Sequence, residues 1–426
     1  VLAALRSTAE ALVAKQLVQH SIVHRILSLF LQHADEADRV SLAQSLNEQL
    51  VHILHTFDGA RVAVHCVSLA SAKDRKTIVK SFKSLVLKIA SEQYGHVVLM
   101  RLFQVTDDTV LLHKSVLVEL LGGLSSLLTS NKFFDQVLLH LIAPSSTYIP
   151  EHTRQLLAAP ALHSKKDPAL RQRELCAHLL VPLLQQLAAD ASSAATSLDT
   201  SVVLYEALCS AAVQLVSDQS GSASTAVAAA ADSTTDNSKK ATKKGKQAAS
   251  EPTTTAAASS SPLSEAVTSV LTALAKLVPT ALVDDGSVLH DFTGSRLLKK
   301  LIMPPASTPA VAAKSDSELS SKKQQQQQQQ HSASAPALAL LSDRLAPSVL
   351  DQMRAQLFGW AMQKSSSFVV LALLDAPSTH SAAQRLLTSH RAALTKSAEK
   401  GSQIIAERLA ASTDAPAAAT PGRRIK

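Results

Sequence analysis

Cysteine and aromatic residues are scarce in this chain of 426 residues, which contains three cysteines and 3% aromatic residues. Cys66, Cys176 and Cys209 are far apart and form no CxxC pair, so neither a disulfide framework nor a zinc site is indicated, and a reducing, intracellular compartment is expected. With so few aromatic residues the core must consist of Leu, Val, Ile and Ala. This composition favours helix-on-helix packing over a sandwich or barrel.

The chain also lacks the signatures of membrane proteins, secreted proteins and enzymes. No apolar run reaches the roughly 20 residues that a membrane-spanning helix needs, and no signal peptide precedes Val1. Because the first residue is not Met, we expect the chain to be a piece of a longer protein. HExxH, GxSxG, GxGxxG and GxxxxGKS/T are absent, so no enzymatic activity and no cofactor are predicted. The histidine pairs His20/His24 and His52/His55 have no evident further ligand, so no metal site is predicted.

Helical periodicity dominates what is present. In residues 73–90, one apolar stripe is formed at helical spacing by Ile78, Phe82, Leu85, Val86 and Ile89. No convincing alternating strand and no Asn-Gly hairpin signal occur. The chain is therefore predicted to be all-α, with similar stripes at 13–31, 40–54, 110–121, 174–187, 263–278, 348–360 and 382–394.

Two segments interrupt the helical pattern. Residues 217–262 are rich in Ala, Ser and Thr with a lysine cluster at 239–246, and residues 304–336 contain the glutamine run 324–330. Both have too few large apolar residues to offset the entropy of ordering, so they are predicted to be disordered insertions. The basic tail 411–426 is predicted to be flexible. Helical repeats are then expected in 1–216, 263–303 and 337–410.

A short motif recurs at the predicted start of a second helix in each repeat. It consists of an aromatic or polar residue, a small residue that is often Gly, two variable residues and two or three aliphatic residues. The copies at 58, 94 and 133 are 36 and 39 residues apart, and further copies begin at 200, 293, 365 and 400. A period of about 36 residues indicates a solenoid of helix pairs. The alternative is a series of generic HEAT-like helix pairs. The small residue that precedes the aliphatic residues of the motif argues against this alternative.

Several stretches resemble a known family. Residues 94–99 (YGHVVL) look like the second helix of a Puf (Pumilio-type) repeat, and residues 55–63, 73–80 and 163–167 resemble the nucleolar Puf-A subgroup, which carries a C-terminal CPL region. The resemblance covers about residues 16–409. It implies a right-handed, L-shaped α-solenoid of Puf repeats, with residues 263–303 in the CPL region. Members carry a basic N-terminal segment and further repeats ahead of this region.

The resemblance also implies a function and partners. These are nucleolar residence, a part in making the large ribosomal subunit within pre-60S particles, and binding of RNA or DNA, single- or double-stranded, with little sequence preference. Base-reading Puf repeats offer two edge-reading side chains and one stacking side chain from the second helix. None of the corresponding triplets here reproduces a standard reading pair, because Val64, Met100, Leu139, Leu371 and Ala406 cannot hydrogen-bond a base edge. Affinity is therefore expected to come from phosphate contacts.

Basic side chains are the candidate phosphate ligands, in keeping with a formal net charge of +8. Lys73, Lys76, Lys80 and Lys83 have helical spacing and are predicted to share one exposed face, with Arg75 nearby. The other candidates are a second basic cluster of Lys165, Lys166, Arg171 and Arg173, and the concave-face residues Arg61, His96, Arg296 and Lys299.

Three functions remain open from the sequence. The first is a nucleolar RNA-binding scaffold that tolerates any sequence and acts with ribosome assembly factors. The second is a solenoid whose concave surface holds a peptide or an assembly factor. The third is an mRNA-specific translational repressor, against which the missing reading pairs argue.

Overall fold

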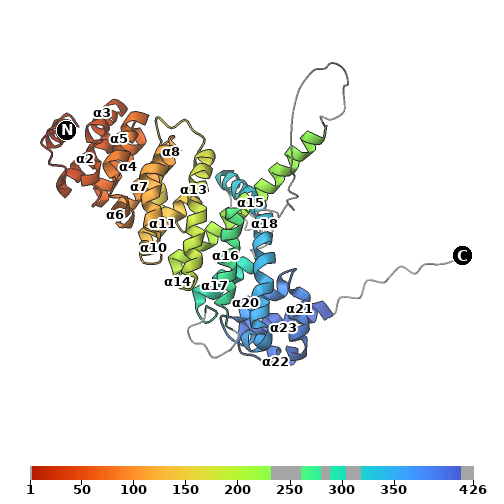
Figure 1. Ribbon diagram of the computed structural model, residues 1–426. Helices are drawn as coiled ribbons and strands as arrows, with labels where there is room; N and C mark the ends of the chain where they lie inside the picture. The colour runs from red at the N-terminus through yellow and green to blue at the C-terminus, as the bar shows by residue number, and fades with distance from the viewer. Residues whose placement is uncertain (1, 232–260, 280–287, 304–317, 414–426) are drawn as a thin grey trace, which may run out of the picture.

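The computed structural model describes residues 2–231, 261–279, 288–303 and 318–413, and within them the side chains outside 219–231, 318–334 and 412–413. Every regular element in these ranges is a helix, which confirms the predicted all-α class. The helices form a bent array in which α1–α13 make one arm and α15–α23 the other (Figure 1).

The helices of the first arm are mostly short. Their bounds are α1 (Leu2–Ala14), α2 (Ser21–His33), α3 (Glu36–Leu46), η1 (Leu50–His52), α4 (Phe57–Leu69), α5 (Ala72–Phe82), α6 (Val86–Ser91), α7 (Gly95–Val105), α8 (Thr109–Leu112), η2 (His113–Leu117), α9 (Val118–Gly122), α10 (Leu124–Leu127), α11 (Lys132–Ile142), α12 (Glu151–Leu157), α13 (Pro168–Ala189) and α14 (Ala191–Thr196).

The second arm contains two long helices, one at its start and one within it. Its elements are α15 (Leu198–Ala231), α16 (Pro262–Lys276), α17 (Phe292–Ile302), α18 (Glu318–Met353), η3 (Arg354–Gln356), α19 (Leu357–Ala361), α20 (Ser367–Asp375), α21 (His380–Leu387), η4 (Thr388–His390), α22 (Arg391–Thr395) and α23 (Lys400–Thr413).

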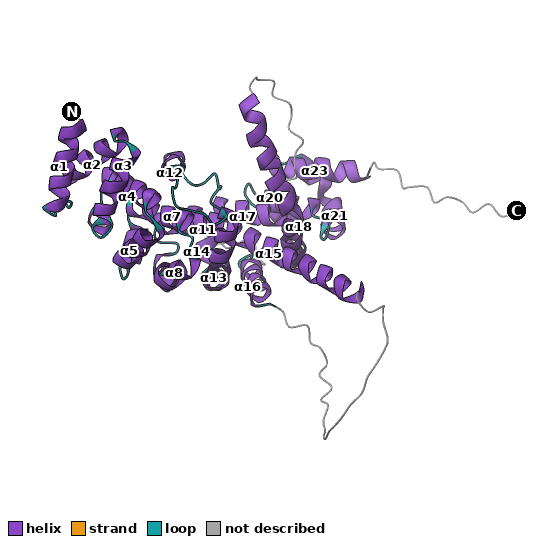
Figure 2. Ribbon diagram, turned by 90° about the horizontal axis from the view of Figure 1, so that it is seen from above, coloured by secondary structure: helices purple, strands orange, loops and turns teal. Residues whose placement is uncertain are grey.

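Each predicted copy of the repeat motif lies at the start of a helix. These helices are α4, α7, α11, α15, α17, α20 and α23; with α2 ahead of them, each contacts the next along the array. We call them the inner row. A second row, the outer row, runs through α5, η2, α13, α16 and α18, and in Figure 2 α5, α8, α13 and α16 lie along one side of the array. Stacked helix pairs of this kind are the predicted solenoid.

The small residue of the motif lies where the preceding segment crosses the first turn of an inner helix. At Gly294 in α17, a Cβ atom would lie 2.6 Å from the carbonyl oxygen of Val288 and 2.5 Å from its Cγ1. Asp291 caps this helix by accepting a hydrogen bond from the Gly294 amide at 2.7 Å. The glycine therefore permits a close crossing and leaves the cap in place.

The core is one continuous aliphatic cluster that runs from Ala9 to Leu409 between the two rows. Trp360 is fully buried in it, as expected of a packing residue. The sequence 198–218 is by length and composition apolar enough to cross a membrane, which the search for apolar runs overlooked. Half of that segment is buried inside the array, as is usual for the core helix of a solenoid.

The predicted apolar stripe of residues 73–90 is broken in the structure. Ser84 has φ of 67°, a left-handed conformation that ends a right-handed helix. Helix α5 therefore ends at Phe82, α6 begins at Val86, and Leu85 is 38% exposed. The Glu119 carboxylate accepts the Ser84 amide at 2.7 Å and so satisfies the broken end.

Two helices of the structure reach into the predicted insertions. Helix α15 continues past residue 217 to Ala231, and α18 already begins at Glu318 and contains the glutamine run. Once a helix is nucleated by packing, each further Ala or Gln adds a hydrogen bond at little cost, so the helix can extend beyond the core. The lysine cluster 239–246 and the basic tail lie outside the described residues.

Candidate nucleic-acid interface

Helix α5 presents the predicted lysine stripe on the outer row. A capping box between Ser71 and Asp74 begins the helix. Lys73, Lys76 and Lys80 are exposed along it, while Ile78, Val79 and Phe82 on the opposite face are buried. Lys83, the cap residue beyond Phe82, is exposed as well. Among the described residues these four lysines make no ion pair, so the stripe is available to an anionic partner.

The neighbouring outer helices extend this basic surface. Exposed cations there are Lys114 on η2, Lys165 ahead of α13 and Arg173 on α13, and Lys88 is exposed on α6, which follows α5 in the chain. Lys165 and Arg173 were predicted; Lys88 and Lys114 were missed, because an isolated lysine gives no pattern in the sequence.

The carboxylates near this outer surface are largely engaged in local bonds. Asp74 closes the capping box of α5, and Glu119 accepts the amides that follow α5. Glu174 pairs with half-buried Lys166, which removes this predicted lysine from the freely exposed set. None of these carboxylates is buried and each keeps its charge, so the outer surface of the first arm is basic because its exposed Lys and Arg side chains outnumber the acids.

Arg75 was predicted to bind phosphate, and the structure contradicts this. It is 2% exposed and donates to the carbonyl oxygens of Val67 (3.2 Å), Val105 (2.8 Å) and Ser68 (3.4 Å) at the ends of α4 and α7. Helix C-termini carry unpaired carbonyl groups, and a guanidinium with five donors satisfies several at once. Arg75 is thus a structural cap between repeats.

Arg171 was also predicted to bind phosphate, and it too is buried, at 3% exposed. Its Nη2 donates to Asp107 Oδ1 at 2.8 Å and to the Lys166 carbonyl at 2.8 Å, and its Nη1 donates to the carbonyl of Gln104. Burial alone raises the pKa of Asp107, but the bonds from Lys165, Arg171 and Ser164 outweigh it and lower that pKa to about 2. A phosphate cannot reach this guanidinium without breaking the pair.

Arg101 on α7 belongs to the same buried group, and the sequence reading overlooked it. It donates to Ser68 Oγ at 2.8 Å, to the Leu157 carbonyl at 2.7 Å and to the carbonyl of Ala159. Burial, and then repulsion from Arg75 and Arg171, lowers the pKa of Arg101 to about 10.

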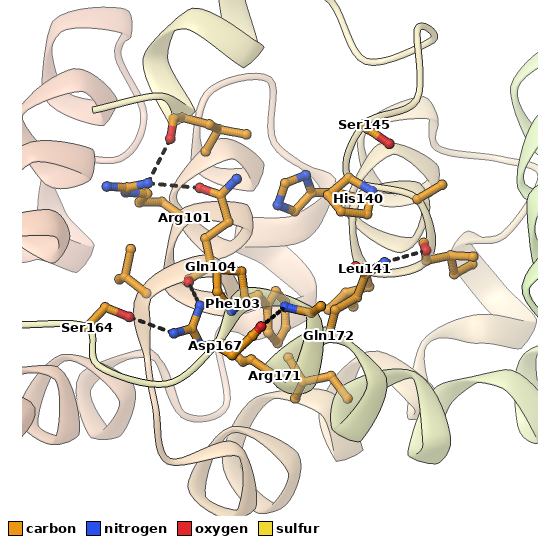
Figure 3. Close-up of a pocket in the computed structure, with 18 of the residues that line it drawn as sticks. Arg101, Phe103, Gln104, His140, Leu141, Ser145, Ser164, Asp167, Arg171 and Gln172 are labelled. Carbon is orange, nitrogen blue, oxygen red and sulfur yellow. Dashed lines mark hydrogen bonds between the residues drawn. The ribbon is translucent and has the colours of Figure 1, made fainter. Parts of the chain in front are cut away.

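A cavity of about 1060 Å³ lies beside Arg101 and Arg171 (Figure 3). His140 also lines it, and burial lowers the pKa of that imidazole to about 4, which keeps it neutral at physiological pH. Most of the arginine donors around the cavity are committed to protein acceptors. The cavity is therefore explained as the space around a structural hydrogen-bond network.

These arginines fasten a long connection, residues 143–167, which we call the strap. It leaves α11, carries α12 and returns to α13. Helix α12 contacts α4 and α7 of the inner row, and in Figure 2 it lies on the side of the array away from α5, α8 and α13. The Leu162 amide donates to Ser68 at 3.2 Å and the Lys165 amide to Asp107 at 2.7 Å. The strap thus covers part of the inner face.

Two predicted inner residues, Arg61 and His96, lie beside this strap. Half-buried Arg61 places its guanidinium 5.6 Å from the ring centre of Phe57. His96 is 3% exposed, packs 5.0 Å from the Phe133 ring and pairs through Nδ1 with the Glu92 carbonyl at 3.0 Å. Burial lowers the pKa of His96, so it is neutral and does not serve as a phosphate ligand.

Arg296 and Lys299 lie on α17 in the second arm, and both are exposed as predicted. Lys299 lies 5.0 Å from the ring centre of Phe368, and its neighbour Lys300 lies 5.5 Å from Tyr148 and 5.2 Å from Tyr205. The sequence reading missed these cation–π contacts, because Tyr148 comes from the strap, far away in the sequence.

Four of the aliphatic residues at the expected base-reading positions are buried in the core, whereas Leu371 is half-buried and Arg296 and Lys299 are exposed. Val64 and Met100 are fully buried, and Leu139 and Ala406 are each 4% exposed. They can neither reach nor hydrogen-bond a base. Among the described residues no group of three or more His, Cys, Asp or Glu side chains is placed to hold a metal ion.

The stacked helix pairs form an α-solenoid with a basic outer row and an inner face that the strap partly covers. The CPL (NUC119) domain family matches residues 130–308. Pumilio homolog 3 of Danio rerio is 36% identical over 197 residues, covering 46% of this chain and 31% of the relative. The human Pumilio homolog 3 is 36% identical over 213 residues, covering 49% and 30%.

The fold agrees with these matches. The crystal structure of human Puf-A superposes with a TM-score of 0.66 at 22% identity, covering 95% of this chain and 64% of that one. Human Puf-A in complex with DNA gives 0.63 at 22% identity, covering 92% and 61%. The chain is therefore similar in sequence to Pumilio homolog 3 over about half of its length and shares its fold with human Puf-A. It matches about a third of the length of the curated relatives.

Proposed function

We propose that this chain binds nucleic acid through phosphate contacts and with little preference for sequence. The observation that carries the proposal is the exposed lysine stripe of α5, which continues onto η2 and α13 while nearby carboxylates are engaged elsewhere. Such a surface attracts a polyanion and displaces its counterions. The solved complex of human Puf-A with DNA supports the same class of partner.

The lack of sequence preference follows from the inner row. Several of the positions that read base edges in other Puf repeats are occupied here by buried aliphatic residues, and none of the triplets is a standard reading pair. Phosphate contacts position a nucleic acid but carry no base information. The role therefore suits a scaffold for RNA better than a repressor of selected mRNAs.

We further propose that the complete protein acts in the nucleolus on precursors of the large ribosomal subunit. The Puf-A resemblance and the CPL match support this assignment. A tagged full-length protein that collects outside the nucleolus, or whose cross-linked RNA contains no ribosomal precursor, would contradict it.

The binding proposal is tested by neutralising the stripe. Replacing Lys73, Lys76, Lys80 and Lys83 by Ala leaves the buried face of α5 intact, and Ala favours the helix. Each lysine that contacts a phosphate contributes roughly 0.7 to 0.9 to the slope of log affinity against log salt. We expect weaker binding of every RNA at low salt and a slope shallower by about three. Fluorescence anisotropy over a salt series measures both.

A matched control removes the same charge elsewhere. Arg385, Arg391, Lys396 and Lys400 are exposed in the terminal repeats of the second arm. Changing all four to Ala should leave the salt slope close to that of the wild type. Equal losses of RNA affinity in the two quadruple variants would show that binding depends on the net charge of the protein and not on a defined surface. An unchanged slope in the stripe variant would move the interface to the inner-face cations Arg61, Arg296 and Lys299.

A further inference from the structure

A second cavity, which we call the inner pocket, opens on the other side of the first arm. Its volume is about 620 Å³ and it lies between α4, α7, α11 and α12. Phe57, Tyr94 and Phe133 line it, and Phe57 is 53% exposed. A pocket of this size with aromatic walls is typical of sites that receive a few side chains or a small ligand.

The charges around the inner pocket have one sign. Its lining contains no Asp or Glu, whereas Arg61 and Lys132 stand at the aromatic rings, at 5.6 Å from the centre of Phe57 and 5.1 Å from that of Phe133. The nearby acids are paired elsewhere, since Asp58 bonds Arg25 at 3.2 Å and Glu151 pairs with Arg154. The rim is therefore complementary to carboxylates.

Helix α12 shapes what can occupy the inner pocket. Its residues His152, Thr153 and Leu156 form one wall. The bonds from Arg101 to the Leu157 and Ala159 carbonyls hold the helix against α7. A nucleic-acid strand running along the inner row would have to leave the surface at this wall. A short segment that inserts side chains from outside meets no such obstacle.

We propose that the inner pocket is a docking site for an acidic segment of a partner protein. One aromatic or large aliphatic side chain inserts between Phe57, Tyr94 and Phe133, and flanking carboxylates contact Arg61 and Lys132. A buried apolar anchor with a charged rim is the usual arrangement at protein–protein contacts. The site is separate from the lysine stripe, so the chain can hold RNA and a protein at the same time.

The test selects random peptides displayed on phage against the whole chain, without nucleic acid. We expect enriched sequences with one aromatic or large aliphatic residue flanked by Asp or Glu. Their affinity, measured by anisotropy of labelled synthetic copies, should fall at least tenfold for Phe57→Ser, which removes a half-exposed ring, and for Arg61→Ser. Phe292→Ser is the matched control, because that ring is 71% exposed on α17 and should not matter. Circular dichroism verifies that each variant remains folded.

Three results would overturn the docking proposal. The first is enrichment of no apolar sequence with acidic flanks. The second is peptide binding that survives both pocket substitutions. In the third, Phe57→Ser and Arg61→Ser weaken a 20-nucleotide single-stranded uridine probe but no peptide, which would assign the pocket to nucleic acid.

Discussion

At the scale of single residues, the buried charges of this solenoid are the most informative. Asp135 on α11 is 3% exposed, and its Oδ2 accepts a hydrogen bond from Thr200 Oγ1 at 2.7 Å, while no hydrogen-bond partner for its Oδ1 is found among the described residues. Burial raises the pKa of Asp135 to about 6. Folding therefore favours the protonated form of the Asp135 carboxyl group. Its contribution to stability is fully present below the ordinary Asp pKa and is lost as pH rises through about 6.

We expect Asp135→Asn to remove this pH-dependent loss of stability. The amide keeps the shape and the bond from Thr200 but carries no charge, so above pH 6 the variant should be more stable than the wild type, by about 2 to 3 kcal/mol at 1.36 kcal/mol per pKa unit. Urea unfolding at pH 5 and pH 8 measures the difference. The exposed Asp351→Asn on α18 is the control. A pH dependence that Asp135→Asn leaves unchanged would show that the carboxylate is not responsible.

At the scale of elements, the repeat depends on how closely the preceding segment crosses each inner helix. At Gly294 the crossing segment is backbone as well as side chain, because the Val288 carbonyl lies in the path of a Cβ. Gly122 at the end of α9 is the opposite case, with no atom within 4 Å of the same position. Comparing Ala substitutions at the two glycines therefore separates the free-energy cost of steric overlap at a crossing from the general effect of replacing Gly by Ala in a helix.

Gly294→Ala should destabilise the protein and Gly122→Ala should not. Overlap with Val288 forces α17 away from its neighbour, and such overpacking costs about 1 to 3 kcal/mol. In Gly122→Ala a helix former replaces Gly in open space, which stabilises by a few tenths of a kcal/mol or is neutral. Thermal unfolding of the two variants gives the comparison. A similar melting temperature for both would show that the motif glycine has no packing role.

At the scale of the molecule, the array separates two surfaces with different chemistry. Helices α5 and α12 lie on different sides of the array (Figure 2). The lysine stripe is on α5, and α12 forms one wall of the inner pocket. The bend between the arms is bridged by Lys300 of α17, whose ammonium lies 3.2 Å from the Tyr148 hydroxyl of the strap. On the two proposals above, RNA and a protein partner would lie on opposite sides of the array.

Unrelated single-stranded RNAs of equal length should bind this chain within a few-fold of one another. The reason is that phosphates are the same in every sequence and that none of the base-reading triplets is a standard reading pair. Competition of several 20-nucleotide RNAs for one labelled probe tests this. A preference of more than about 100-fold for one short sequence, equivalent to roughly 2.7 kcal/mol, would mean that base edges are read.

The sequence by itself determined the repeat. The motif copies at 58, 94, 133, 200, 293, 365 and 400 each begin an inner helix, because helical periodicity and a small residue at a crossing are local properties that the sequence records. The exposed lysines of α5 were predictable for the same reason, since residues three and four apart on one helix share a face.

Only the tertiary structure decided which cations remain available. Arg75 and Arg171 stand among lysines in the sequence but point to helix ends, where unpaired carbonyl groups of α4 and α7 need donors. The inner pocket was equally beyond local patterns, because its walls come from helices that are about 40 to 100 residues apart. Burial and long-range hydrogen bonding depend on which helices meet, and that is set by packing of the whole array.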